Sequence, residues 1–131
     1  MAKTSQHILQ AGAIPLHRGK VCLVTSSSRK RWVIPKGVID PGFTAKEAAL
    51  QEAWEEAGLT GELRYRSAGS YVYEKWGGTC HVTVYEMRVT DIADDWPEVD
   101  LRDRIWVAPV KALQLLDEPE LRDILRAVTA R

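Results

Sequence analysis

Three glutamates, Glu52, Glu55 and Glu56, stand close together in a stretch rich in Ala, Glu and Leu. In an α-helix, residues at positions i, i+3 and i+4 lie on one face, so these three carboxylates cluster and repel one another. The nearest basic residue is Lys46, a turn and a half before Glu52. Such a face is either a solvated acidic surface or a set of ligands for a hard cation such as Mg²⁺ or Mn²⁺. The helix alone does not decide between the two.

The helix that carries these glutamates is predicted over residues 45–57. Thr44, followed three residues later by Glu47, has the pattern of a capping box, and Gly58 is the expected C-terminal glycine. On a helical wheel of about 100° per residue, the larger apolar residues fall opposite the acidic face. The residues that we therefore expect to face the core are Leu50, Ala53, Trp54 and Ala57.

The loop before this helix extends the pattern. Gly37–Phe43, then seven residues, then Gln51–Leu59 resembles the Nudix box. That family pattern is Gly, five residues, Glu, seven residues, then Arg-Glu-aliphatic-any-Glu-Glu-any-Gly-aliphatic, and its spacing is kept here without a gap. The resemblance implies an α/β fold, the Nudix α/β/α sandwich, with a mixed β-sheet between helices.

Two positions depart from the family pattern: Phe43 replaces its first glutamate and Gln51 replaces its arginine. In the family these two residues commonly pair, so we interpret the change as the loss of one salt bridge. The resemblance implies metal-dependent hydrolysis of a phosphoanhydride bond. The alternative is a degenerate Nudix domain that binds nucleotide or inositol phosphates as a sensor without cleaving them.

The resemblance also implies roles for single residues. Glu52, Glu55 and Glu56 would hold Mg²⁺ or Mn²⁺, helped by the main-chain carbonyl of Lys36. The metals would lower the pKa of the attacking water and neutralise developing phosphate charge. The catalytic residues would be Glu56 and Glu52. For the general base, Glu56 is the first choice, and Glu52 and Glu98 are rivals.

Outside the box, Ser27-Ser28-Arg29 with Arg31–Pro35, and Asp95–Glu98 further on, resemble the diphosphoinositol polyphosphate and diadenosine polyphosphate hydrolase branch. In that branch the serine-arginine loop and a later basic pair hold phosphates, so the substrate is expected to be a phosphate-rich small molecule. The candidates for substrate contact are Ser27, Ser28, Arg29, Lys36, Gly37, Lys75, Arg102 and Arg104. Tyr73 and Trp76 could stack on a nucleobase, although aromatic residues in strands and turns are more often packing residues.

Composition limits the other classes of protein. The chain has 131 residues, with 18 basic and 18 acidic side chains, which suits one globular domain over residues 1–131. Residues 1–36 contain no Asp or Glu, yet the chain is neutral and lacks a recognisable binding motif, so we do not expect it to bind nucleic acid.

No apolar run approaches a membrane span, and the first ten residues do not have the pattern of a secretory signal. We expect a cytoplasmic protein in which Cys22 and Cys80 are buried core residues; the sequence predicts no oligomeric state.

The remaining elements are predicted from periodicity and turn signals. A loop is expected over residues 36–42, and Asp117 with Pro119 indicates a final helix. Its core stripe would be Leu121, Ile124, Leu125 and Val128. Strands are expected at Ile8–Leu16, Val21–Thr25, Trp32–Ile34, Glu62–Ser67, Ser70–Glu74, Cys80–Val89 and Arg104–Val107.

Overall fold

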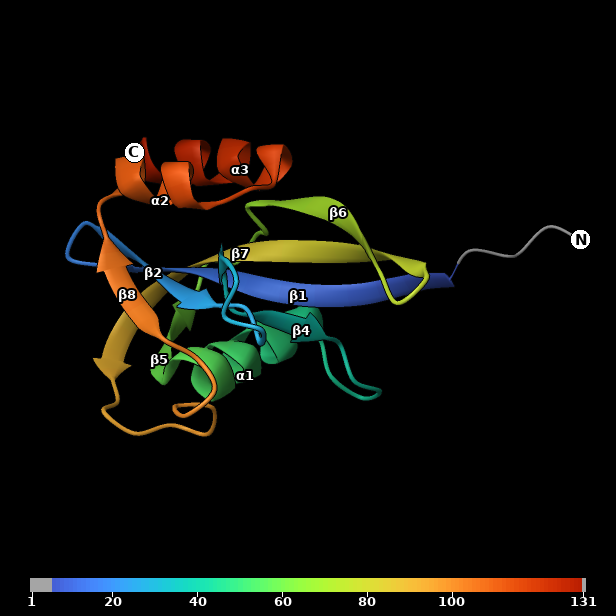
Figure 1. Cartoon of the computed structure of the whole chain (residues 1–131), viewed down its shortest axis with the longest axis horizontal. Helices are drawn as coiled ribbons and strands as arrows, with labels where there is room; N and C mark the ends of the chain where they lie inside the picture. Colours follow the sequence, from blue (N-terminus) through green and yellow to red (C-terminus); the bar gives the residue numbers. More distant parts are fainter. Residues whose placement is uncertain (1–5, 131) are drawn as a thin grey trace, which may run out of the picture.

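The computed structural model describes residues 6–130, which form an eight-stranded mixed sheet with helices on both faces (Figure 1). The predicted sandwich, a mixed sheet between helices, is therefore confirmed. Half of the N-terminal segment that lacks a secretory pattern, residues 1–5, lies outside the described range. The strands are β1 (Gln6–His17), β2 (Lys20–Thr25), β3 (Trp32–Val33), β4 (Lys36–Val38), β5 (Leu59–Leu63), β6 (Gly69–Lys75), β7 (Gly78–Ile92) and β8 (Arg104–Val107), and the helices are α1 (Ala45–Ala57), α2 (Pro109–Leu115) and α3 (Pro119–Thr129).

Strand β1 is the centre of the sheet. The main order is β3-β2-β1-β7-β5, while β4 pairs with β1, β6 with β7 and β8 with β2. Only the β1–β7 pair is parallel among the described strand pairs, with Ile8 opposite Cys80 and Leu16 opposite Arg88. Since α1 connects β4 to β5 beneath this sheet, the loop after β4 and the first turn of α1 come to lie beside the start of β1 (Figure 1).

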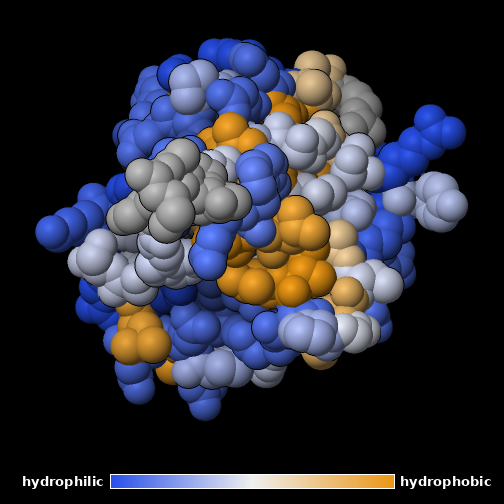
Figure 2. Space-filling view, turned by 90° about the vertical axis from the view of Figure 1, so that its right-hand side faces the viewer, coloured by the Kyte–Doolittle hydropathy of each residue, from blue (hydrophilic) through white to orange (hydrophobic). Residues whose placement is uncertain are grey.

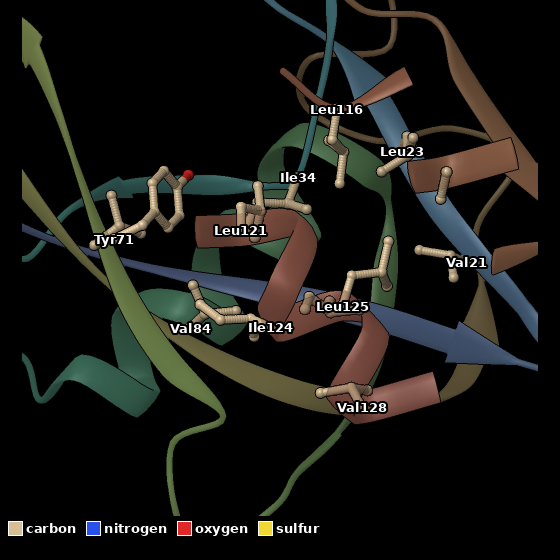
Figure 3. Packing of buried hydrophobic residues seen from close by; sticks show 13 residues of the cluster. Val21, Leu23, Ile34, Tyr71, Val84, Leu116, Leu121, Ile124, Leu125 and Val128 are labelled. Atoms are coloured by element: carbon tan, nitrogen blue, oxygen red, sulfur yellow. The ribbon is translucent and has the colours of Figure 1, made fainter. Parts of the chain in front are cut away.

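The core between the sheet and α3 is built from the stripe predicted in the final helix. All four of its members are buried, and they pack against Val21 and Leu23 of β2, Val84 of β7 and Tyr71 of β6 (Figure 3). Side chains alternate between the two faces of a strand, so Val21 and Leu23 face α3 whereas Cys22 and Val24 face α1. Both cysteines are buried as predicted, and burial raises the pKa of the Cys22 thiol to about 12.

The core between the sheet and α1 differs in part from the prediction: Ala53 and Ala57 are fully buried as expected, whereas Trp54 and Leu50 are not. Its helix side consists of small residues, Ala48, Ala49, Ala53 and Ala57, together with the buried Glu56. Trp54, which we expected to face the core, is 41% exposed, and Leu50 is only partly buried. Alanine lets a helix approach a sheet closely, whereas the tryptophan ring would hold it away. The helix is therefore rotated so that one of its glutamates lies on the buried side.

Two strands and one helix also depart from the prediction. The strand expected over Glu62–Ser67 is β5, which begins at Leu59 directly after the helix and ends at Leu63. Residues 36–38, expected in a loop, form β4, because Gly37 and Val38 pair with Ala11 and Gln10 of β1. Helix α2 was not predicted. No helix between residues 6 and 130 is both long enough and apolar enough to cross a membrane.

Candidate active site

Both ends of helix α1 are held by local contacts. The Glu47 N–H donates to Thr44 Oγ1 at 3.1 Å, and the Thr44 N–H donates to Glu47 Oε1 at 2.9 Å, so the predicted capping box is confirmed. Gly58 ends the helix in the left-handed region, with φ at 68°. A Cβ on Gly58 would lie 2.9 Å from the Trp96 ring, so a larger residue would push this ring away. These contacts fix the first and last residues of α1, and therefore which of its turns carry the glutamates.

A cavity of about 340 Å³ lies where α1, β4, the β6–β7 turn and the loop after β7 meet. It contains seven of the predicted site residues, together with Glu98, so that carboxylates and basic side chains share one cavity. The residues that line it are Gln10, Ser26, Ser27, Arg31, Val33, Lys36, Gly37, Val38, Glu52, Glu56, Tyr73, Lys75, Trp76, Glu98 and Arg102.

Glu56 is the most buried acid of the cavity, with 5% of the residue exposed. Its Oε1 accepts a hydrogen bond from the Lys36 N–H at 3.2 Å, and its Oε2 lies 3.3 Å from Arg102 Nη2. Burial raises the pKa of Glu56 to about 8; Arg102 opposes this shift, whereas the neighbouring Glu52 adds to it. A buried carboxyl with such a pKa favours a proton or a cation as its partner at neutral pH.

Glu52 shares the cavity and lies against Gly37. A Cβ at position 37 would overlap the Glu52 carboxylate, so only glycine permits this close approach. Burial, together with the charge of Glu55, raises the pKa of Glu52. Glu55 itself does not line the cavity, and its Oε1 accepts a hydrogen bond from Gln51 Nε2 at 2.9 Å. Two of the three predicted carboxylate ligands thus line the cavity, as does Lys36, whose main-chain carbonyl was the fourth predicted ligand.

The donor set fits a hydrated Mg²⁺ or Mn²⁺ better than a closed protein cage. Within residues 6–130, no three His, Cys, Asp or Glu side chains are grouped so that they could hold a metal ion by themselves. Mg²⁺ usually binds one or two carboxylates and completes its shell with waters and substrate phosphates. Glu52 and Glu56, two hard carboxylates of which one is buried beside an open cavity, match this mode of binding.

Arg102 connects three parts of the site. Its Nε donates to Glu98 Oε1 at 2.7 Å, its Nη1 donates to the Thr25 carbonyl at 2.9 Å, and its Nη2 faces Glu56. Only 13% of its side chain is exposed. The guanidinium therefore joins α1, the end of β2 and the loop after β7, and it places Glu98 beside the Glu52–Glu56 pair.

Two other predicted phosphate contacts bind carbonyl groups of the protein's own main chain instead of lining the cavity. Arg29 donates to the carbonyls of Asp100 at 2.7 Å and Leu101 at 3.2 Å. Arg104 donates to the carbonyls of Ala57 and Ala93, both at 2.8 Å, and its guanidinium stacks on Trp96. Neither lines the cavity, and both hold the loop after β7 in place. In the serine loop, Ser27 lines the cavity, whereas the Ser28 hydroxyl lies 3.3 Å from that of Ser26.

The two lysines of the cavity lie beside aromatic rings. Lys36 Nζ lies 4.9 Å from the centre of the Tyr73 ring, and Lys75 Nζ lies 4.5 Å from that of the Trp76 ring. Burial lowers the pKa of Lys36, an effect that Glu56 opposes. Trp76 is 63% exposed and has a φ of 55°, a conformation that non-glycine residues seldom adopt. The positive φ values of Trp76 and Gly77 are those that a two-residue turn between β6 and β7 requires.

Sequence reasoning missed several lining residues. Gln10 is the clearest case: it is 3% exposed, and its Oε1 accepts a hydrogen bond from the Tyr73 hydroxyl at 2.7 Å. A glutamine inside an otherwise apolar strand is an available signal, because a buried amide needs partners. The other lining residues that were not selected as site residues are Ser26, Arg31, Val33 and Val38.

The stability of the metal-free protein should depend on pH through Glu56. Its folded pKa, about 8, lies above the ordinary glutamate value of 4.5, so the folded state holds this proton more tightly than the unfolded chain does. The contribution to the free energy of unfolding is complete below the unfolded pKa and is lost as the pH rises through about 8. Urea unfolding in chelator at pH 6 and pH 9 should show this loss in the wild type and a smaller one in Glu56→Gln. Equal losses would mean that other groups dominate.

Taken together, carboxylates and several basic side chains line one cavity, a combination with the chemistry to hold a divalent cation and an anion. Comparison with known proteins identifies the family: the model of the Nudix domain matches residues 6–128, so the chain belongs to the Nudix family. Nudix hydrolase 12, mitochondrial, of Arabidopsis thaliana is 38% identical over 104 residues, which are 73% of this chain and 51% of the relative. Diphosphoinositol polyphosphate phosphohydrolase 3-alpha of Homo sapiens is 37% identical over 99 residues, 72% of this chain and 58% of the relative.

The chain thus spans about half the length of these curated relatives. Among solved structures, the crystal structure of C. elegans Ap4A hydrolase superimposes with a TM-score of 0.76 at 23% identity, covering 95% of this chain and 98% of that one. A Nudix hydrolase from Nitrosomonas europaea gives a TM-score of 0.78 at 18% identity, covering 95% and 90%. At these identities the structural likeness shows the fold.

Proposed function

We propose that this Nudix protein hydrolyses a phosphoanhydride bond with the help of Mg²⁺ or Mn²⁺, in a substrate that joins a nucleoside to a polyphosphate chain. The observation that carries the proposal is the cavity itself, which brings Glu52 and Glu56 together with Lys36, Lys75 and the exposed ring of Trp76. In this arrangement the carboxylates suit a cation, the ammonium groups suit phosphates and the aromatic ring suits a nucleobase.

In this proposal, Glu52 and Glu56 hold the cation, which supplies Lewis-acid polarisation of the phosphate oxygens and of the attacking water. Lys36 orients Glu56 through its main-chain N–H, and its ammonium group lies 4.9 Å from the centre of the Tyr73 ring, which also lines the cavity. Lys75, on the wall formed by the β6–β7 turn, binds negative charge on the polyphosphate chain. Glu98, held by Arg102 at 2.7 Å, is placed to accept a proton from the attacking water and is therefore a rival of Glu56 as general base.

Two observations favour a nucleoside-linked substrate over a diphosphoinositol polyphosphate. The first is charge: of the four basic residues that line the cavity, Arg31 forms an ion pair with Glu118 at 3.0 Å, and Arg102 with Glu56 and Glu98. Of these four, Lys36 and Lys75 are the two that form no short ion pair with a residue in the described range, so their charge is available to the substrate. An inositol ring with phosphates on nearly every carbon needs more basic groups than a short polyphosphate chain does.

The second observation is the aromatic surface. Stacking on an aromatic ring is worth about 1–3 kcal/mol per base. Trp76→Ala should therefore raise the KM for diadenosine polyphosphate by about tenfold with a small change in kcat. Trp54→Ala, which removes an exposed tryptophan outside the cavity, is the matched control. Equal KM values in both variants would remove Trp76 from substrate binding.

A substrate panel tests the function as a whole. Release of phosphate and nucleotide would be measured from diadenosine polyphosphates, diphosphoinositol polyphosphate, ADP-ribose and nucleoside triphosphates, with Mg²⁺, with Mn²⁺ and with chelator. We expect metal-dependent cleavage of the diadenosine polyphosphates. Cleavage of diphosphoinositol polyphosphate alone would reverse the choice of substrate. Binding without cleavage of any compound would favour the sensor alternative, motivated by Phe43 and Gln51.

The place of action in the cell remains a prediction as well. The composition favours a cytoplasmic protein, whereas several plant relatives are named mitochondrial. Fractionation of the producing cells with antibodies against the chain would decide between these compartments.

A further inference from the structure

Two of the three histidines of the chain meet on the sheet, outside the active-site cavity. His7 Nδ1 and His81 Nε2 lie 2.8 Å apart, and the ring centres are 5.0 Å apart with the planes tilted by 38°. His7 belongs to β1 and His81 to β7, the two strands that run parallel at the centre of the sheet.

The register of the two strands explains this pairing. His7 lies opposite Thr79 and Leu9 lies opposite His81, so the two histidines are diagonal neighbours on the same face of the sheet. It is the face that α1 covers further along β1, at Ala11 and Ala13. At the end where β1 begins, the surface is mostly hydrophilic around a patch of apolar side chains (Figure 2). His7 is exposed there, and Leu9 is 62% exposed.

We propose that His7 and His81 form a surface site for a divalent transition-metal ion such as Zn²⁺, Ni²⁺ or Cu²⁺. Imidazole nitrogens suit these ions, whereas Mg²⁺ prefers oxygen ligands. Two nitrogens bound to one tetrahedral zinc ion at about 2.0–2.1 Å each are about 3.3 Å apart. The rings now lie at the hydrogen-bond distance of 2.8 Å, so they must separate by about half an ångström to admit the ion. Water completes the coordination shell, because the described residues offer no group of three metal ligands.

An ion at this site links β1 to β7 close to the turn that carries Lys75 and Trp76. Gly78, the first residue of β7, pairs with both Gln6 and Lys75, and His81 follows three residues later. Occupation of the site therefore stabilises the strand ends on which one wall of the active-site cavity is built. The ligand chemistry is distinct from that of the carboxylate site, so the two sites are separable by the choice of metal.

The test is calorimetric titration with Zn²⁺ of a chain carrying Glu52→Gln and Glu56→Gln, so that the cavity carboxylates do not compete. We expect one equivalent of Zn²⁺ to bind, together with a rise in Tm. Removing a residue that only hydrogen-bonds to a metal ligand typically lowers metal affinity by about tenfold. His81→Asn removes a ligand itself, so it should weaken Zn²⁺ binding by at least about tenfold.

His17→Asn is the matched control, because His17 is part-buried and its ring bonds instead to the Val89 carbonyl at 3.3 Å. This variant should bind Zn²⁺ as the parent does. NMR of the imidazole ¹⁵N nuclei should show both His7 and His81 shifting with Zn²⁺ and neither shifting with excess Mg²⁺. Equal affinities of the His81→Asn and parent chains, or shifts confined to His17, would overturn the proposal.

Discussion

Replacing Glu56 with glutamine is expected to lower metal-dependent turnover by at least about a hundredfold while the fold persists. Glutamine has nearly the same shape and can still accept the hydrogen bond from the Lys36 N–H. It cannot carry the negative charge that a divalent cation requires. Burial raises the pKa of this carboxyl to about 8, so the metal-free fold tolerates a neutral group at this position and the amide should cost little stability. The measurement is kcat against Mn²⁺ concentration, with circular dichroism to verify the fold.

Glu55→Gln is the matched variant for this experiment. It changes the same chemical group one position earlier in the helix, at a side chain that does not line the cavity. We expect a much smaller loss of turnover than in Glu56→Gln. Similar losses in both variants would mean that the substrate-bound site recruits all three glutamates, and undiminished turnover in Glu56→Gln would remove this residue from the mechanism.

Replacing Arg102 with glutamine should have the largest effect on stability among the site residues. The change removes the ion pairs to Glu56 and Glu98 and the hydrogen bond to the Thr25 carbonyl. The free energy of unfolding should fall by about 2–3 kcal/mol, because buried polar groups lose their charged partner. The loss is not larger because Glu56 can bind a proton when the arginine is gone. Turnover should also fall by at least about tenfold, because Glu98 and Glu56 lose the group that orients both of them. Urea unfolding in chelator, with the m-value verified, measures the stability.

Two controls make the Arg102 result specific. Arg88→Gln removes an exposed arginine whose ion pair with Glu62 spans 2.9 Å at the surface, and such pairs contribute about 0–1 kcal/mol. Arg102→Lys keeps the charge but not the planar fork, so it should recover only part of the loss. If Arg102→Gln unfolds at the same urea concentration as Arg88→Gln, the three contacts do not support the site.

The sequence by itself determined the helix that presents the glutamates. Thr44, Glu47 and Gly58 act through contacts within a few residues, so their pattern predicts both ends of α1. The stripe of α3 is likewise a local periodicity, and all its members are buried as predicted. The family spacing from Gly37 to Leu59 led to the family that the comparisons then showed.

Only the tertiary structure decided how these parts face one another. The rotation of α1 depends on how closely the helix packs on the sheet; its alanines permit the close approach, Trp54 turns outward and Glu56 becomes buried. Which arginines face the cavity depends on which carbonyls lie within reach, so Arg29 and Arg104 hold the loop after β7 whereas Arg102 reaches Glu56. Contacts between residues far apart in the chain leave no periodic signal in the sequence, and the walls of this cavity are built from such contacts.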